Sequence, residues 1–126
     1  MAKKSKQPNP FTGRWRIISM SAWEDDYLDE EVEAYIEFDT QGGGDFQFGC
    51  VQGQIDCRIK TRDGKPAVEF SWEGGDGADG TPLTGRACAI LDSGELHGEF
   101  CIHLGDDSDF VAKKKDPRPN PKKPKR

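Results

Sequence analysis

The 126-residue chain carries a net charge of -5, and its 33% content of hydrophobic residues is low for a globular protein. Residues 11–112 hold 22 of the 23 Asp and Glu residues but only seven of the 18 Lys and Arg residues, so an acidic domain lies between two basic ends. This length predicts one domain. The chain lacks a run of about 18 apolar residues and a signal-peptide pattern, which argues against a membrane span and against secretion.

Both ends of the chain are polar and rich in proline. We expect residues 1–10 to form a disordered basic N-terminal tail and residues 114–126 to form a disordered Lys/Pro-rich C-terminal tail, because neither has apolar side chains to bury. Residues 11–113 are then the folded domain. Its acidic surface would repel phosphates, so nucleic acid is an unlikely partner except through the C-terminal tail.

The first predicted strand runs from about Phe11 to Met20 and begins with a glycine two residues before Trp15. Ser21 and Glu24 have the spacing of a capping box, which predicts one short helix after this strand. Within it, Trp23, Tyr27 and Leu28 are spaced to share one apolar helix face.

Seven further strands are expected from alternating apolar and polar residues and from the turn signals between them. Gln52-Gly53 is interpreted as a two-residue hairpin turn between two of them. Gly85, Ala87 and Ala89 give the sixth strand small inward groups, whereas the other strands present bulky ones. The predicted ranges are 32–39, 46–50, 55–60, 68–73, 83–91, 96–104 and 109–113.

Eight strands with short connections predict an all-β fold: an eight-stranded antiparallel up-and-down barrel with one short helix after the first strand. In a barrel of this size the interior is either filled by its own side chains or holds one small ligand. The residues alone leave both alternatives open.

The stretch Phe11-Thr12-Gly13-Arg14-Trp15-Arg16, followed by a short acidic helix and alternating strands, resembles the opening of calycin proteins, the lipocalins and intracellular fatty-acid-binding proteins. The stretch from Ile102 to Ser108 resembles the end of a group of small bacterial proteins to which we attach no activity. The calycin resemblance implies an apolar ligand inside the barrel and a basic residue, Lys113 or Lys114, above Trp15. The Arg-x-Tyr pair of fatty-acid-binding proteins is replaced by Phe110-Val111-Ala112, which argues against a fatty acid as the ligand.

The leading functional hypothesis is non-catalytic binding of a small apolar molecule inside the barrel. The alternative is a filled barrel that acts as a protein-interaction module through its acidic surface or its basic tail. The ligand-binding residues expected for the first hypothesis are the inward aromatic residues Trp15, Phe38, Phe48, Phe70, Trp72 and Phe100.

No residue pattern favours an enzyme, a metal site or a cofactor. His97 and His103 share a strand face but lie about 20 Å apart at 3.3 Å per residue, too far to share one metal. Cys101 and His103 are also too far apart for a nucleophile and its base. The four cysteines, at positions 50, 57, 88 and 101, form no C-x-x-C pair, so we expect free thiols and a cytoplasmic location.

Overall fold

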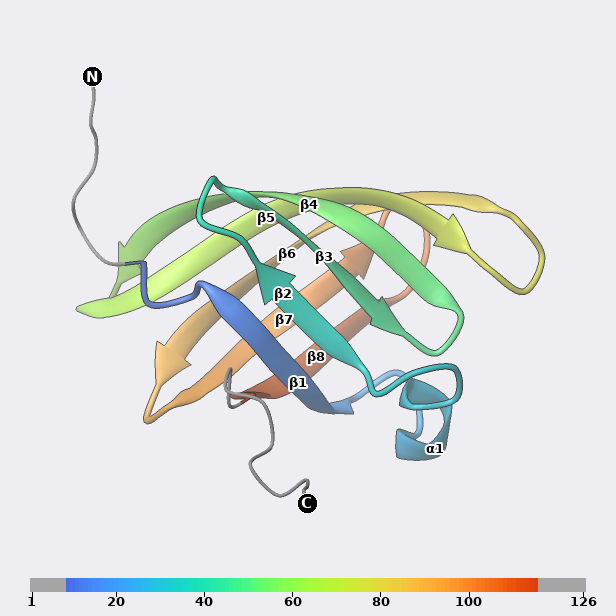
Figure 1. Ribbon diagram of the computed structural model, residues 1–126, viewed down its shortest axis with the longest axis horizontal. Coiled ribbons are helices and arrows are strands. Elements are labelled where there is room, and N and C mark those ends of the chain that lie inside the picture. Colours follow the sequence, from blue (N-terminus) through green and yellow to red (C-terminus); the bar gives the residue numbers. More distant parts are fainter. Residues whose placement is uncertain (1–8, 116–126) are drawn as a thin grey trace, which may run out of the picture.

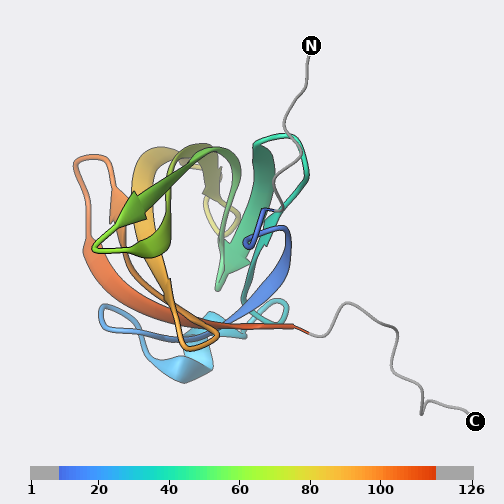
Figure 2. The ribbon, with the colours of Figure 1, turned by 90° about the vertical axis from the view of Figure 1, so that its left-hand side faces the viewer.

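Eight antiparallel strands close into a barrel in which each strand pairs with its neighbours in sequence and β8 pairs back with β1 (Figures 1 and 2). The computed structural model describes residues 9–115. The strands are β1 (Gly13–Met20), β2 (Tyr35–Phe38), β3 (Gly43–Phe48), β4 (Val51–Arg62), β5 (Lys65–Asp76), β6 (Pro82–Asp92), β7 (Glu95–Ile102) and β8 (Asp107–Lys114). The helix α1 (Asp25–Leu28) follows β1. The all-β barrel and its single helix are therefore confirmed.

The predicted tails lie mostly outside the described residues, which exclude 1–8 and 116–126. Lys114, which was assigned to the C-terminal tail, is the last residue of β8 and pairs with Trp15. In the described part of the chain, no helix is long and apolar enough to cross a membrane.

Alternation along the strands places the apolar side chains inside, as expected. In β2, Ile36 and Phe38 are buried, whereas Tyr35 and Glu37 between them are partly exposed. The sixth strand does carry the small groups: Ala87 and Ala89 are buried, and a Cβ on Gly85 would lie 2.8 Å from the Trp72 ring. Small residues on β6 thus make room for the large rings opposite.

The turn predicted at Gln52-Gly53 is wrong, because the chain reverses at Gly49 and Cys50 and both predicted turn residues lie within β4. Gly49 has φ +55°, a conformation that favours glycine, and its Cα lies against the Tyr27 ring. Glycine is required at position 53 for a different reason: a Cβ there would come within 3.0 Å of the rings of Phe46 and Trp72.

The predicted capping box is also wrong. α1 has Glu24 as its N-cap, without a side-chain hydrogen bond to the helix. The Ser21 hydroxyl instead accepts the Asp109 N–H at 2.9 Å, and the Ser21 N–H donates to the Asp109 carbonyl. Ser21 therefore continues the β1–β8 pairing instead of starting the helix. The predicted apolar helix face is present only in part: Leu28 is buried and Tyr27 packs on the core, whereas Trp23 precedes the helix and forms a β-bridge with Met20, although its ring also packs on the core.

Candidate functional site

All six aromatic residues predicted to bind a ligand lie in the barrel interior, and each is at most 3% exposed. They come from five regions of the barrel wall, since alternation directs one face of every strand inward. They are Trp15 on β1, Phe38 on β2, Phe48 on β3, Phe70 and Trp72 on β5, and Phe100 on β7.

These rings mostly contact one another. Trp72 stacks on Phe100 at a centroid distance of 5.1 Å, and Phe48 meets Phe100 edge to face at 5.2 Å. Phe46, which was not among the predicted site residues, packs between Trp72 and Phe100 at 5.1 and 5.2 Å. Its place two residues before Phe48 on the same strand face was the signal that could have found it. The ligand-binding role of the six residues stays a prediction.

One polar atom in this aromatic interior has no hydrogen-bond partner among the described residues. It is the indole Nε1 of Trp72, whose side chain is buried next to Gly85. A buried N–H without an acceptor is costly, by about 1–3 kcal/mol. An acceptor atom reaching this position would therefore be stabilised.

The end of the barrel that carries Trp15 is sealed. The Trp15 indole N–H donates to the Phe11 carbonyl at 2.8 Å, and the Lys114 ammonium lies 4.8 Å from the centre of the indole ring. Lys114 also donates to the Thr12 carbonyl, and partial burial lowers its pKa. Of the two lysines expected above Trp15, Lys114 is the one in place, whereas Lys113 pairs with Glu95 at 3.6 Å.

An open groove of about 1020 Å³ runs along β4–β7. Outward residues such as Gln54 and Glu73 line it together with the buried residues Ile55 and Trp72, and the turn at 103–105 forms one border. Leu104 in this turn is 94% exposed and has φ +60°, an unusual conformation for a non-glycine residue. The groove therefore combines polar and apolar lining residues with one projecting apolar side chain, Leu104.

Charge is segregated between the two ends of the barrel. The end that carries α1, here called the α1 end, is built from residues 21–34, 49–50, 76–81 and 103–107. These segments contain eleven Asp and Glu residues and no Lys or Arg, whereas the other described residues contain eleven acids and ten Lys or Arg. Two of the eleven acids are paired with cations from outside these segments, Asp29 with Arg16 and Glu33 with Arg16 and Lys115. A surface of this kind attracts cationic partners and repels anionic ones.

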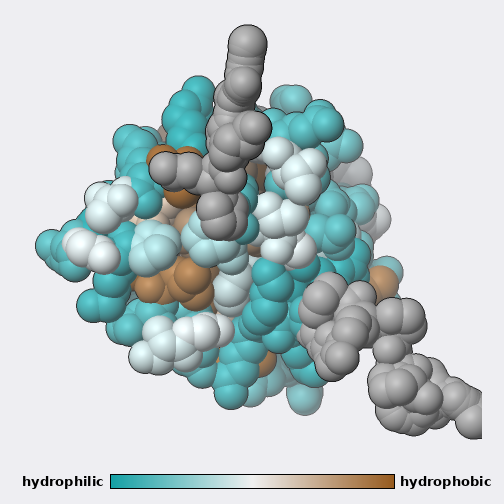
Figure 3. Space-filling view, turned by 60° about the vertical axis from the view of Figure 1, so that its left-hand side comes forward, coloured by the Kyte–Doolittle hydropathy of each residue, from teal (hydrophilic) through white to brown (hydrophobic). Residues whose placement is uncertain are grey.

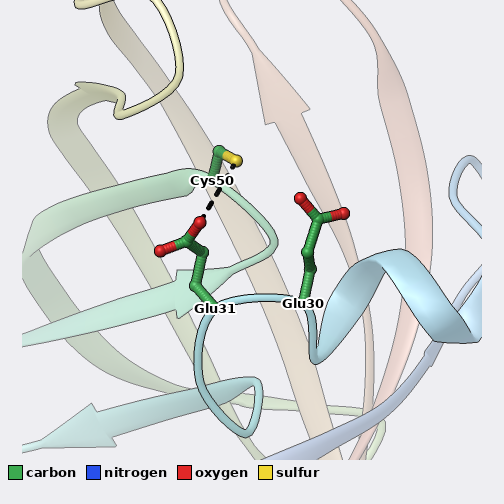
Figure 4. A group of neighbouring side chains, drawn as sticks. All are labelled: Glu30, Glu31 and Cys50. Carbon is green, nitrogen blue, oxygen red and sulfur yellow. Dashed lines mark hydrogen bonds between the residues drawn. The ribbon is translucent and has the colours of Figure 1, made fainter.

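Three side chains at the α1 end have the spacing of metal ligands. Glu30 and Glu31, in the loop after α1, approach Cys50 in the β3–β4 turn, and their ligand atoms lie within 4.8 Å of one another (Figure 4). Desolvation, and then the carboxylates of Glu30, Glu31 and Asp76, raise the pKa of the Cys50 thiol. Because metals bind the thiolate, the negative surroundings that attract a cation also disfavour the ligand form of this cysteine.

His97, Glu99 and Cys101 direct their side chains away from the core of β7, as alternation predicted, whereas His103 lies in the turn after β7 and not on the predicted strand. His97, Glu99 and His103 are exposed, and His97 lies 3.1 Å from Glu95. Burial, followed by a hydrogen bond with Asp107, raises the pKa of Cys101 and keeps it protonated. All four cysteines are free thiols.

The geometry defines a closed, all-β barrel whose interior is lined with aromatic rings. No protein family, no curated protein and no solved structure matches the chain.

Proposed function

We propose that this protein is a non-catalytic interaction module that binds a basic protein segment at the α1 end of a filled barrel. The observation that carries the proposal is the acidic charge of this end, beside a groove whose rim holds Leu104. Of its eleven carboxylates, Asp29 and Glu33 pair with Arg16 and Lys115, and the other nine form no ion pair among the described residues. Basic side chains of the partner would meet the carboxylates, and an apolar side chain would cover Leu104.

The packed interior supports a surface role over an interior one. The Phe46 and Phe100 rings contact each other and both Phe48 and Trp72, so an interior ligand would have to displace aromatic side chains. Displacing closely packed groups from a core typically costs several kcal/mol. A partner at the surface carries no such cost.

A fluorescein-labelled peptide, Lys-Leu-Lys-Lys-Leu-Lys, tests the proposal by fluorescence anisotropy at low and high salt. We expect Asp106→Asn/Asp107→Asn to weaken binding by about two- to thirtyfold, since exposed charge pairs contribute about 0.2–1 kcal/mol each. The matched control, Asp63→Asn/Asp92→Asn, removes two carboxylates at the opposite end, one in the β4–β5 turn and one at the end of β6, and should leave affinity unchanged. Equal weakening by both pairs would contradict a site at the α1 end.

Interior binding of a small apolar molecule is the second candidate, and the unpartnered Trp72 N–H favours it. The ligand would carry one acceptor atom, such as a carbonyl oxygen, for this donor. Saturable quenching of tryptophan fluorescence by an apolar ketone, lost in Trp72→Phe, would support this candidate. Quenching that never saturates would argue against it.

We also propose that the protein is related to the calycins. The support is the eight-stranded up-and-down barrel together with Lys114 above Trp15, the arrangement that the resemblance implied. We also propose a cytoplasmic location, because four free cysteines fit a reducing compartment.

A further inference from the structure

β4 is longer than its neighbour β3, so part of β4 has no partner strand on that side. Pairing with β3 ends where Gly43 lies opposite Asp56, and the Cys57 N–H then donates to the Gly42 carbonyl at 2.9 Å. On its other side, β4 continues to pair with β5 as far as Arg62. Within residues 9–115, nothing pairs with the β3 side of β4 over residues 58–62. The closed barrel therefore retains one short open strand edge, where the β4–β5 hairpin projects on the left of Figure 1.

The backbone groups that face this open edge can be identified from the last bond to β3. In an antiparallel strand, residues two apart direct their N–H and C=O groups to the same side. Because the Cys57 N–H faces β3, the backbone groups of Ile59 and Thr61 face the open edge, and those of Arg58 and Lys60 face β5. Residues 58–66 are all exposed. Such an edge is a template on which a further strand can pair.

The side chains at this edge differ on the two faces of the strand. Arg58, Lys60 and Arg62 occupy the outer face, and Ile59 on the other face is 46% exposed although it is in phase with the core residues. Figure 3, which turns this end toward the viewer, shows a small hydrophobic area within a mostly hydrophilic surface. A strand that paired here would place alternate side chains beside the cations and beside Ile59.

The β4–β5 hairpin carries more basic than acidic residues, in contrast to most of the barrel. Residues 56–69 contain four Lys or Arg residues and three acids, whereas the other residues from 9 to 115 contain six Lys or Arg and 19 acids. Lys60 and Arg62 share a single carboxylate, Glu69, at 3.3 Å each. Arg58 lies 3.7 Å from Asp56. These three cations therefore have two carboxylate partners between them, which leaves positive charge beside the open edge.

We propose that the open edge of β4, residues 58–62, binds an extended peptide segment that alternates acidic and apolar residues, by adding it as a further strand. The segment's backbone pairs with Ile59 and Thr61, its acidic side chains lie beside Arg58 and Lys60, and its apolar side chains cover Ile59. This site is independent of the proposed function, which concerns a basic partner at the opposite end.

A second copy of the chain does not fit this edge. Antiparallel pairing of two such edges would set Arg58, Lys60 and Arg62 of one copy against the same residues of the other, and like charges in facing positions destabilise a sheet. The cations therefore protect the edge from self-pairing and at the same time select an acidic partner.

Amide hydrogen exchange measured by NMR on the full chain tests the proposal. The probe is a capped eight-residue peptide that alternates Glu and Val, and the control peptide alternates Lys and Val. We expect the Glu/Val peptide to slow exchange of the Ile59 and Thr61 amides at least tenfold, and the Lys/Val peptide to leave them unchanged. Equal effects of the two peptides, no effect of either, or slow exchange of both amides in the free protein would overturn the proposal.

Two variants separate backbone pairing from charge. Thr61→Pro removes an N–H that faces the open edge and spares the ladder with β5, so the fold should tolerate it. It should weaken Glu/Val binding at least tenfold, while Thr61→Val, which keeps the N–H, should not. Arg58→Glu/Lys60→Glu should reverse the preference toward the Lys/Val peptide, and this reversal does not depend on the stability of the proline variant. An unchanged preference in the charge-reversed protein would contradict the proposal.

Discussion

The two ends of the barrel are closed in different ways. At the end where the chain enters β1, the buried rings of Phe11 and Trp15 close the interior, an indole hydrogen bond joins them, and Lys114 lies over Trp15. At the α1 end a four-residue helix and its loops cover the interior, with Trp23 only partly buried at 4.9 Å from the Phe48 ring.

This difference suggests that the Trp15 end stabilises the fold and that the α1 end binds a partner. The Trp15 end uses apolar burial together with satisfied hydrogen bonds, which stabilise a fold. The α1 end presents eleven carboxylates and an exposed leucine on loops, and loops carried by a rigid scaffold are where binding residues concentrate. The account therefore predicts that substitutions at the Trp15 end affect unfolding and that substitutions at the α1 end affect binding.

The largest expected effect is that of Trp15→Ala. Truncating a fully buried tryptophan typically costs about 3–5 kcal/mol, and here it also leaves the Phe11 carbonyl without its donor. Trp23→Ala, at the other end, should cost about 1–2 kcal/mol, because that ring is partly exposed and its loss creates less cavity. Urea unfolding followed by far-ultraviolet circular dichroism measures both, and equal costs would contradict the distinction between the ends.

Gly49→Ala tests how α1 is attached to the barrel. A methyl group at this position would overlap the Tyr27 ring at 2.2 Å, and the residue also has φ +55°. We expect a loss of about 1–3 kcal/mol of unfolding free energy. Gly94→Ala is the matched control, since it has φ +82° but no atom within 4 Å of the added Cβ. A loss no greater than that of the control would show that the contact with Tyr27 does not matter.

The two tyrosines predict a loss of stability at high pH. Burial, followed by the hydrogen bond to Asp45, raises the pKa of Tyr35 to about 12, and burial also raises the pKa of Tyr27. Since the folded state holds these protons more tightly than the unfolded state, stability is complete below pH 10 and falls as the pH rises toward 12. Absorbance at 295 nm should show Tyr35→Phe removing the later of two ionisations. A single ionisation near pH 10 in the unmodified protein would contradict these environments.

The smallest effect on stability is expected for Leu104→Ser. The side chain is almost fully exposed, so the unfolding free energy should change by no more than about 0.5 kcal/mol. Binding of the Lys-Leu-Lys-Lys-Leu-Lys peptide should nevertheless weaken, because the apolar contact is lost. Fluorescence anisotropy measures the binding. An affinity equal to that of the unmodified protein would show that Leu104 is not part of the binding surface.

Strand alternation and turn residues were sufficient to predict the barrel, the position of the helix and the buried side of each strand. The failures occurred where one residue type has two physical uses. Gln52-Gly53 resembles a hairpin turn, yet Gly53 is needed because Phe46 and Trp72 occupy the space of its side chain. Ser21 resembles an N-cap, yet its hydroxyl is used by the Asp109 N–H of β8. Both uses depend on residues far away in the sequence.

The candidate surfaces were harder to predict than the core. The sequence gives the total of acidic residues, but their concentration at the α1 end follows from the alternation of loops between the two ends. The open edge of β4 depends on the unequal lengths of β3 and β4, and the misplaced turn concealed that difference. Phe46 was missed as a site candidate although its alternation with Phe48 was visible.

The central claim is that the barrel is filled and acts through its surface. Native mass spectrometry of the freshly purified full-length protein, compared with its denatured mass, tests this claim most directly. The account predicts the mass of the bare chain in both conditions. An additional small-molecule mass that is present only under native conditions, and that is absent in Trp72→Phe, would contradict this claim. It would support binding of a small molecule inside the barrel instead.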